Sequence, residues 1–205
     1  MNECDAILYV VDDDAAMRRS LAYLFDAGGW RVETFESARA FLDNYTGHVP
    51  GCLLLDVRMP LMSGLELQPL LQQRGIKLPV IFLSGHGDLP MAVQAMKAGA
   101  SDFLEKPCKD QVLLDAVTRA VARSVREATQ DAQARAAHSA LDTLTARERE
   151  VAQAVASGKA NKVIAMDMAI SEKTVQVHRH NALAKLGVRS AAEVARLLMA
   201  SGQLD

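Results

Sequence analysis

The first 125 residues alternate short apolar runs with longer segments whose apolar residues recur at the spacing of one helix face. This alternation restricts the fold more than any other feature, because parallel strands need crossover connections and a helix is the usual one. Runs 51–55 and 79–84 are almost wholly apolar, as is typical of strands covered on both faces. We therefore expect a (βα)5 doubly wound parallel sheet, and we expect Pro69 to kink or restart its third helix. The expected strands are 6–11, 30–35, 51–55, 79–84 and 101–105, and the expected helices are 15–27, 37–44, 63–74, 88–98 and 109–125.

The remaining 80 residues contain no strand pattern. Residues 126–140 are rich in Ala, Gln and Arg without Gly or Pro, so we expect a helical extension or a semi-rigid helical linker there. After it the apolar spacing is helical, and Thr145 with Glu148 forms a capping box at one predicted helix start. We expect four short helices in this part. The predicted organisation is an α/β domain over 1–125, a linker over 126–140 and a small all-α domain over 141–205.

Composition excludes several classes of protein. Half of the 205 residues are apolar and the net charge is only −2, which excludes an intrinsically disordered chain. No apolar run approaches the ~18 residues that a membrane-spanning helix needs, and the acidic start Met-Asn-Glu-Cys-Asp is unlike a secretory signal. The three cysteines show no CxxC spacing, so we expect a reducing cytoplasm.

The small net charge conceals an asymmetry between the two parts of the chain. Residues 1–125 hold 12 Lys and Arg against 16 Asp and Glu, whereas residues 126–205 hold 11 against 9. An acidic part joined to a basic part is consistent with two domains that have different partners, and also with ordinary scatter.

Carboxylates follow two of the expected strands. Asp12 and Asp13 come directly after the first strand, and Asp56 ends the third. Because ligands of open α/β sheets bind beyond the carboxyl ends of the strands, these side chains converge if the two strands are neighbours. Carboxylates with backbone carbonyls suit a hard cation such as Mg²⁺. Either group alone is also explained as turn or capping residues, and their joint occurrence favours the metal site.

Two further polar side chains follow expected strands. Ser84 ends the fourth, and Lys106 follows the fifth, directly before Pro107. A metal, an ammonium and a hydroxyl around one carboxylate are what a phosphoryl acceptor requires, because the cations neutralise the phosphoryl oxygens while the carboxylate attacks. No GxxxxGK[ST] loop occurs, so nucleotide hydrolysis is not indicated.

These motifs, in this order, resemble the receiver domain of two-component response regulators over about residues 6–122. The resemblance implies that Asp56 accepts a phosphoryl group from a sensor histidine kinase. It implies that Asp13, Asp56 and the backbone carbonyl of Arg58 hold Mg²⁺ or Mn²⁺, with Asp12 acting through the water shell. The motifs are Val10-Val11-Asp12-Asp13, Leu55-Asp56-Val57-Arg58-Met59-Pro60, Ser63-Gly64, Ser84-Gly85-His86-Gly87 and Glu105-Lys106-Pro107.

The same resemblance assigns the switch residues. Lys106 would grip the phosphoryl oxygens, at a peptide bond to Pro107 that is usually cis in this family. Ser84 would bond the phosphoryl group and let Phe103 rotate inward, although a plain core role for Phe103 is equally consistent with the sequence.

In the helical part, a helix expected at 160–167, a tight turn at 168–170 and a helix at 171–186 follow the order of a helix-turn-helix. Taken by itself, the polar face of the second helix is better explained as the solvated surface of an amphipathic helix, and only a family pattern favours a DNA-binding face. Such a pattern is present over 141–201, which resembles the LuxR-type helix-turn-helix. It is carried by Leu144-Thr145-Ala-Arg-Glu148-Arg-Glu150-Val151, Ser157-Gly158-Lys-Ala-Asn161-Lys162-Val-Ile-Ala165 and Ser171-Glu172-Lys-Thr174-Val175-Gln-Val177-His178.

The LuxR resemblance implies double-stranded promoter DNA, with inverted half-sites, as the partner. Gln176 and His180 stand where many relatives carry Lys or Arg, which predicts a shallower salt dependence. The residues that would face bases are Gln176, Val177 and His180, and those that would hold phosphates are Asn161, Lys162, Lys173, Thr174, His178 and Lys185.

Together the two domains resemble the NarL/FixJ family of transcriptional regulators, in particular its FixJ-like branch through Ser84-Gly-His-Gly-Asp88-Leu-Pro90-Met-Ala92. This resemblance implies that the protein forms a homodimer when it is phosphorylated. It also implies RNA polymerase as a further candidate partner and no association with a membrane. Val194, Leu197 and Leu198 are the candidate dimer residues, with core packing as the alternative, and the 88–98 helix with the fifth strand is a second candidate.

Two other functions are weighed against this prediction. A phosphorylation-independent interaction module is disfavoured by the intact set of Asp12, Asp13, Asp56, Ser84 and Lys106. An aspartyl-phosphate phosphatase places a second Asp two residues after its nucleophile, where this chain has Arg58, so we expect no enzyme beyond self-phosphorylation and dephosphorylation.

Overall fold

The computed structural model describes residues 6–47, 49–85 and 89–203, so residues 86–88 of the FixJ-like motif lie outside the described part. The chain divides into two compact units, Met1–Ala128 and Thr129–Asp205.

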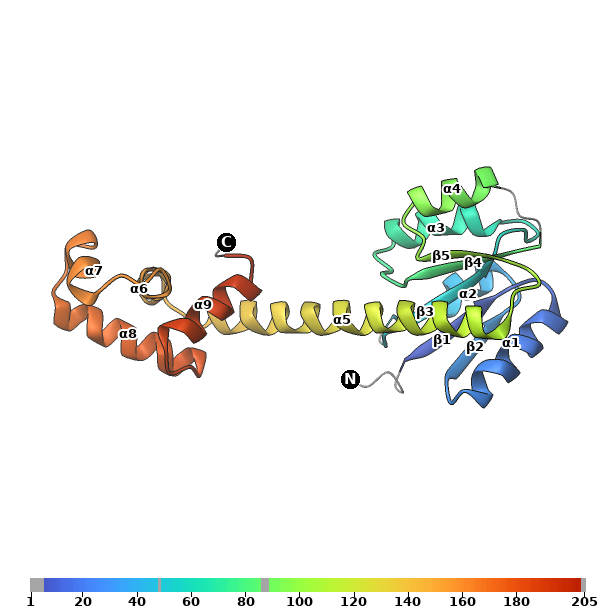
Figure 1. Ribbon diagram of the computed structural model, residues 1–205. Coiled ribbons are helices and arrows are strands. Elements are labelled where there is room, and N and C mark those ends of the chain that lie inside the picture. Colours follow the sequence, from blue (N-terminus) through green and yellow to red (C-terminus); the bar gives the residue numbers. More distant parts are fainter. Residues whose placement is uncertain (1–5, 48, 86–88, 204–205) are drawn as a thin grey trace. The chain divides into compact units, whose positions relative to one another are not determined.

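The first unit contains one five-stranded parallel sheet in the order β2-β1-β3-β4-β5, which confirms the predicted (βα)5 architecture (Figure 1). In the register, Val11 of β1 lies opposite Leu55 of β3, so the residues that follow both strands emerge at the same edge. The strands are β1 (Ile7–Val11), β2 (Arg31–Phe35), β3 (Gly51–Asp56), β4 (Val80–Ser84) and β5 (Asp102–Glu105).

Helices cover both faces of this sheet. Side chains that alternate along β1 and β3 divide between two apolar cores, because successive residues of a strand point to opposite faces. One core joins the sheet to α2, α3 and α4, and the other joins it to α1 and α5, as Figure 1 shows. These helices are α1 (Ala15–Ala27), α2 (Ala38–Asn44), α3 (Gly64–Gln73), α4 (Leu89–Lys97) and α5 (Asp110–Asp142).

Helix α3 is continuous where a kink or restart was expected, and α5 confirms that residues 126–140 are helical. Helix α3 runs through Pro69 as one helix and does not restart there. Gln68, next to this proline, is buried and donates to the carbonyls of Ala95 and Ala98, which ties α3 to the end of α4. Helix α5 continues as one helix from the expected 109–125 segment through 126–140 to Asp142.

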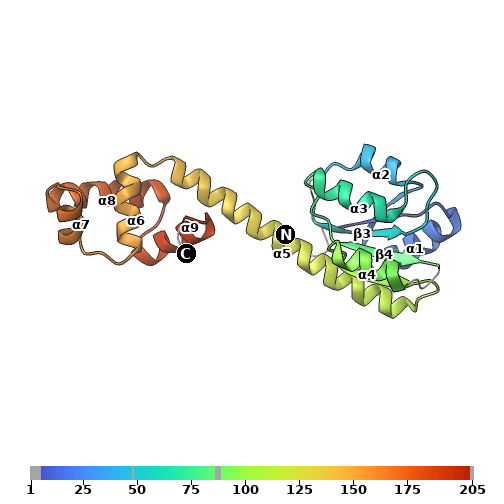
Figure 2. The ribbon, with the colours of Figure 1, turned by 90° about the horizontal axis from the view of Figure 1, so that it is seen from above.

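Over its described residues, 129–203, the second unit consists of the end of α5 and four short helices. Thr145 caps α6 by accepting from the Glu148 amide at 3.3 Å, and Ser171 caps α8 by accepting from the Thr174 amide at 3.0 Å. Helix α6 packs on both α8 and α9, and α7 packs on α8 (Figures 1 and 2). The helices are α6 (Ala146–Ala156), α7 (Asn161–Asp167), α8 (Glu172–Leu186) and α9 (Ala191–Ala200).

Within the described residues, every helix is too short or too polar to cross a membrane.

Candidate functional site

One ammonium group joins two carboxylates at the carboxyl edge of the sheet. Lys106, which follows β5, donates from Nζ to Asp12 Oδ2 at 2.6 Å and to Asp56 Oδ1 at 2.5 Å. Asp12 and Asp56 are only 2% and 8% exposed, so water screens their charges poorly. The structure thus brings together three of the predicted residues from β1, β3 and the end of β5.

The second oxygen of each carboxylate is also occupied. Asp56 Oδ2 accepts from the Arg58 amide at 2.7 Å, and Asp12 Oδ1 accepts from the Asp14 amide at 2.9 Å. Arg18 of α1, which sequence reasoning missed, donates from Nη1 to the backbone carbonyls of Asp12 and Asp13. The sequence did contain a signal for this contact, because Arg18 lies one turn into the helix that follows an acidic loop.

The electrostatics of this group follow from burial and pairing. Burial raises the pKa of Asp56, and the nearby Asp12 charge adds to this, while Lys106 and the Arg58 amide lower it; the net shift is upward. Burial by itself lowers the pKa of Lys106, but its bonds to Asp12 and Asp56 outweigh this effect and raise the pKa overall. Lys106 is therefore firmly a cation.

The donor chemistry at this edge fits a hard divalent cation, because carboxylate and carbonyl oxygens are the ligands that Mg²⁺ prefers. Asp13 is exposed, and Asp56 lies beside the Arg58 backbone. Over residues 6–47, 49–85 and 89–203, no three Asp, Glu, His or Cys side chains form a ready metal cluster. Lys106 lies instead between Asp12 and Asp56, so the three carboxylates do not converge on one point as the sequence suggested.

The two predicted switch residues lie next to this group. Ser84 is buried at the end of β4, and its backbone carbonyl accepts from the Lys106 amide at 2.7 Å. Phe103 of β5 is partly buried and packs against Phe82, with ring centroids 6.2 Å apart. The peptide bond between Lys106 and Pro107 is cis.

Helix α8 of the second unit exposes a stripe of predicted DNA-binding residues. Lys173, Gln176, Val177 and His180 are exposed and are spaced so that they share one face of the helix. Val177, an apolar residue, is 52% exposed. The Thr174 hydroxyl shares a hydrogen bond with the hydroxyl of the helix-capping Ser171, at 2.7 Å, so part of its hydrogen-bonding capacity is used within the protein. Lys162 is exposed at the start of α7, and His178 is half-buried.

Two polar contacts on these helices were not anticipated. Lys185 donates to Glu148 Oε2 at 2.6 Å, and Glu148 is only 4% exposed. Arg179 donates to Asn161 Oδ1 at 3.0 Å, which joins α8 to the start of α7. Lys185, whose side chain is still 39% exposed, therefore compensates a buried carboxylate. Arg179 is an additional cation beside the predicted phosphate-binding residue Asn161.

The predicted dimer residues of α9 require a correction. Val194 and Leu198 are 1% and 0% exposed within the core that α6, α8 and α9 share, so their side chains are not available to a second chain. Leu197 is half-buried against the same core. The small domain needs these side chains for its own interior, which was the alternative interpretation.

Sequence comparison identifies two families in this chain. Residues 8–118 match the family described as "Response regulator receiver domain", and residues 142–198 match "Bacterial regulatory proteins, luxR family". The chain is 43% identical over 197 residues to the response regulator protein TmoT of Ectopseudomonas mendocina, covering 96% of this chain and 90% of TmoT. It is 41% identical over 198 residues to the transcriptional regulatory protein FixJ of Bradyrhizobium diazoefficiens, covering 97% of each.

Solved structures agree with these matches. The low-resolution structure of the response regulator StyR superposes with a TM-score of 0.87 at 42% identity, covering 95% of this chain and 98% of StyR. Full-length FixJ from B. japonicum gives a TM-score of 0.59 at 40% identity, covering 98% of both chains.

Gly64, at the start of α3, provides a first test of this geometry. A Cβ there would lie 2.3 Å from the Asp56 carbonyl oxygen and 2.9 Å from Leu55 Cγ. We expect Gly64→Ala to destabilise the first unit by about 1–3 kcal/mol through overpacking, measured by urea unfolding. Gly85→Ala is the matched control, since a Cβ at Gly85 meets no atom within 4 Å. Equal stability of the two variants would contradict the close approach.

The Glu148–Lys185 contact predicts a pH dependence. The bonds from Lys185 and Thr145 lower the pKa of Glu148 from 4.5 to about 2. Because the folded-state pKa is depressed, this stabilisation is complete above pH 4.5 and is lost as the pH falls toward 2. We expect Glu148→Gln to lower the melting temperature of the second unit by several degrees at neutral pH and to flatten its decline in acid.

Circular dichroism during thermal unfolding of the full chain, between neutral pH and pH ~2.5, measures this difference. Glu150→Gln is the control, because Glu150 lies on the same helix and forms only an exposed ion pair with Arg147. If the melting temperature of Glu148→Gln falls with pH in parallel with that of the parent throughout the acid range, the Glu148–Lys185 contact is not the source of the pH dependence.

Proposed function

The chain belongs to the NarL/FixJ family of two-component response regulators, and on this premise we propose that phosphorylation of Asp56 controls its binding to promoter DNA. It is a DNA-binding transcriptional regulator with a receiver domain and a LuxR-type domain. The receiver has a sensor histidine kinase as its partner, and the LuxR-type domain binds DNA. The family is one of transcriptional regulators and not of enzymes.

One observation carries the assignment to Asp56, namely the Lys106 ammonium that Asp12 and Asp56 share at the carboxyl edge. In the proposed step, Asp56 Oδ1 or Oδ2 attacks the phosphorus of the kinase phosphohistidine. A P–O bond forms, the P–N bond breaks, and the released imidazole takes up a proton. Lys106, already bonded to Asp56, is placed to neutralise a phosphoryl oxygen on the product.

Mg²⁺ is the proposed cofactor, with Mn²⁺ as a substitute. Asp13, Asp56 and the Arg58 carbonyl would hold it, and Asp12 would act through its water shell. When bound, it supplies positive charge that stabilises the phosphoryl oxygens. The rest of the work belongs to the chain: Lys106 orients the acceptor carboxylate, and the Arg58 amide holds Asp56 Oδ2 in place at 2.7 Å.

The proposed response begins at Ser84 and Phe103. The Ser84 hydroxyl would bond the new phosphoryl group, and Phe103, which is only partly buried against Phe82, would move inward. Phosphorylation would thereby shift a two-state receiver toward its active form, since the added charge interacts differently with the two states.

For DNA recognition we propose that α8 enters the major groove. Gln176, Val177 and His180 would face the bases, because they lie on one exposed face of the helix. Lys162, Lys173 and Asn161 would contact phosphates, with Thr174 and His178 beside them. Arg179, which bonds Asn161, would join the phosphate-contacting residues. Lys185 would contact a DNA phosphate only if its ammonium group left Glu148.

For homodimerisation on phosphorylation we propose the receiver surface of α4, because Val194 and Leu198 lie in the second unit's core. Val93 and Met96 of α4 are 44% and 47% exposed and lie on one face of the helix. We further propose that the dimer binds inverted DNA half-sites and contacts RNA polymerase. The proposed location of the protein is the cytoplasm.

Asp56→Asn tests the phosphorylation mechanism. With acetyl phosphate and Mg²⁺, the parent should acquire one phosphoryl group and gain about 5–150-fold in affinity for a promoter fragment selected from random DNA. The variant should do neither, because an amide is not a phosphoryl acceptor. Phosphate-affinity electrophoresis and fluorescence anisotropy provide the two measurements.

Asp26→Asn, at an exposed position of α1, should behave as the parent does. A gain in affinity by Asp56→Asn equal to that of the parent would favour the phosphorylation-independent module and refute the mechanism.

Lys173→Ala and Gln176→Ala separate phosphate contact from base contact. Lys173→Ala should weaken binding to all sequences and reduce the slope of log K against log salt by about 0.9. Gln176→Ala should cost about 1–3 kcal/mol at one base pair and relax specificity there. Anisotropy titrations over a range of salt, with Arg19→Ala at an exposed position of α1 as control, measure both. A uniform loss across sequences for Gln176→Ala would exclude base readout.

A further inference from the structure

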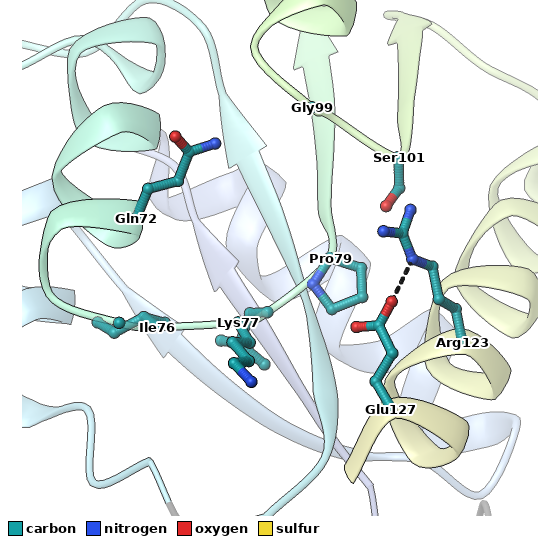
Figure 3. A pocket seen from close by; sticks show the side chains of 10 residues that line it. Gln72, Ile76, Lys77, Pro79, Gly99, Ser101, Arg123 and Glu127 are labelled. Carbon is teal, nitrogen blue, oxygen red and sulfur yellow. Dashed lines mark hydrogen bonds and ion pairs between the residues drawn. The ribbon is translucent and has the colours of Figure 1, made fainter. Parts of the chain in front are cut away.

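Arg18 of α1 uses its guanidinium to hold backbone atoms of the loop between β1 and α1. Elsewhere in the first unit, Arg123 is exposed and pairs with a carboxylate, that of Glu127, at 2.7 Å (Figure 3). Arg18 is half-buried, and its Nη1 instead donates to the carbonyl oxygens of Asp12 at 2.7 Å and Asp13 at 3.0 Å. One nitrogen thus joins two successive residues of the acidic loop.

The position of Arg18 on α1 does not serve the helix itself. Helix α1 begins at Ala15 after its cap Asp14, so Arg18 lies one turn from the end whose partial positive charge repels a cation. Helical side chains lean toward the amino end, which directs the Arg18 side chain back over the loop that precedes the helix. The contacts with this loop therefore account for the place of the cation.

The two bonds from Arg18 fix the backbone of Asp13. The Asp12 carbonyl belongs to the peptide plane before the Asp13 Cα, and the Asp13 carbonyl belongs to the plane after it. Because peptide units are planar, holding both planes fixes the φ and ψ angles of Asp13 and, with them, the direction of its Cβ. Asp13 is exposed, so the direction of its carboxylate is set from the backbone.

The other two carboxylates at this edge are held directly. Asp12 and Asp56 both accept from the Lys106 ammonium, and each also accepts from a backbone amide. Asp13 differs, because its support comes through its carbonyl and Arg18. Arg18 thus orders the exposed carboxylate, as Lys106 orders the two buried ones.

We propose that Arg18 is a positioning residue for the divalent cation, because it fixes the direction of the Asp13 carboxylate before the ion binds. This rests on the proposed function, in which Asp13 is a ligand of Mg²⁺. Arg18 acts only through Asp13 and does not touch the ion. A ligand that is ordered in advance loses less conformational freedom on binding, so the affinity for the ion is higher.

Mg²⁺ titration of Arg18→Met tests the proposal, since Met keeps an unbranched stem but cannot donate to the two carbonyls. The amide resonances of Asp14 and Arg58 in the ¹⁵N-labelled, unphosphorylated full chain report binding, because these amides bond the carboxylates of Asp12 and Asp56. At constant ionic strength we expect saturable shifts in the parent and about 10–100-fold weaker binding in the variant. A purely electrostatic role predicts the opposite, because losing a nearby positive charge would tighten Mg²⁺ binding.

Two further variants separate the bonds of Arg18 from its charge. Arg18→Lys keeps the charge and a donor but not the guanidinium fork, so its affinity for Mg²⁺ should lie between those of the parent and Arg18→Met. Arg19→Met carries the same substitution at the next position, which is exposed, and should bind Mg²⁺ as the parent does.

Urea unfolding distinguishes positioning from a general loss of stability. Trp30 is the one tryptophan of the chain and packs against the core of the first unit, so its fluorescence follows unfolding of that unit within the full chain. Mg²⁺ that binds the folded state raises the unfolding midpoint. We expect this rise to be smaller for Arg18→Met than for the parent, whatever their midpoints without Mg²⁺.

The proposal is overturned if Arg18→Met binds Mg²⁺ as tightly as the parent or more tightly. It is also overturned if Mg²⁺ raises the unfolding midpoints of the two proteins equally. A parent that binds no Mg²⁺ at this edge would overturn the proposed cofactor together with the role of Arg18. If the parent binds Mg²⁺ and Asp56→Asn behaves as expected, the proposed function stands whatever Arg18→Met shows.

Discussion

The Lys106 ammonium, held between Asp12 and Asp56, is the interaction on which the receiver site depends. Both carboxylates are largely buried, and two such charges repel each other strongly where water is scarce. Removing one partner from a buried ionic group of this kind costs about 3–5 kcal/mol. Asp12 and Lys106 follow β1 and β5, and Asp56 ends β3; these strand ends meet only when the sheet has its full strand order. The bonds to Lys106 are thus tied to the folded sheet.

The DNA-binding unit is organised by a similar pair. Glu148 is buried on α6, and the Lys185 ammonium of α8 compensates its charge at 2.6 Å. The pair fixes α8 against α6, and with it the exposed face that carries Gln176 and His180. The Arg179–Asn161 contact fixes the other end of the motif in the same way.

Sequence reasoning was most accurate where local signals were strong. Strands such as Ile7–Val11 and Val80–Ser84 lie within one residue of their predicted ranges, since continuous apolar runs bounded by polar residues have one interpretation. The Thr145 cap was also readable, because a cap is formed by residues three apart. The expected restart at Pro69 was wrong, since the burial of Gln68 and its contacts with the end of α4 are invisible in the sequence. Val194 and Leu198 had two interpretations that only packing could separate.

By itself the sequence determined the alternation of strands and helices, the polar residues at the strand ends and the helix-turn-helix order, because these depend on residue type and short-range spacing. The tertiary structure decided which of those polar residues meet. It placed Lys106 between Asp12 and Asp56 and drew Lys185 to Glu148. Such contacts join residues 37–94 positions apart, and hydrogen bonds and ion pairs act only over a few ångströms. No pattern in the sequence specifies distances of that kind before the chain has folded.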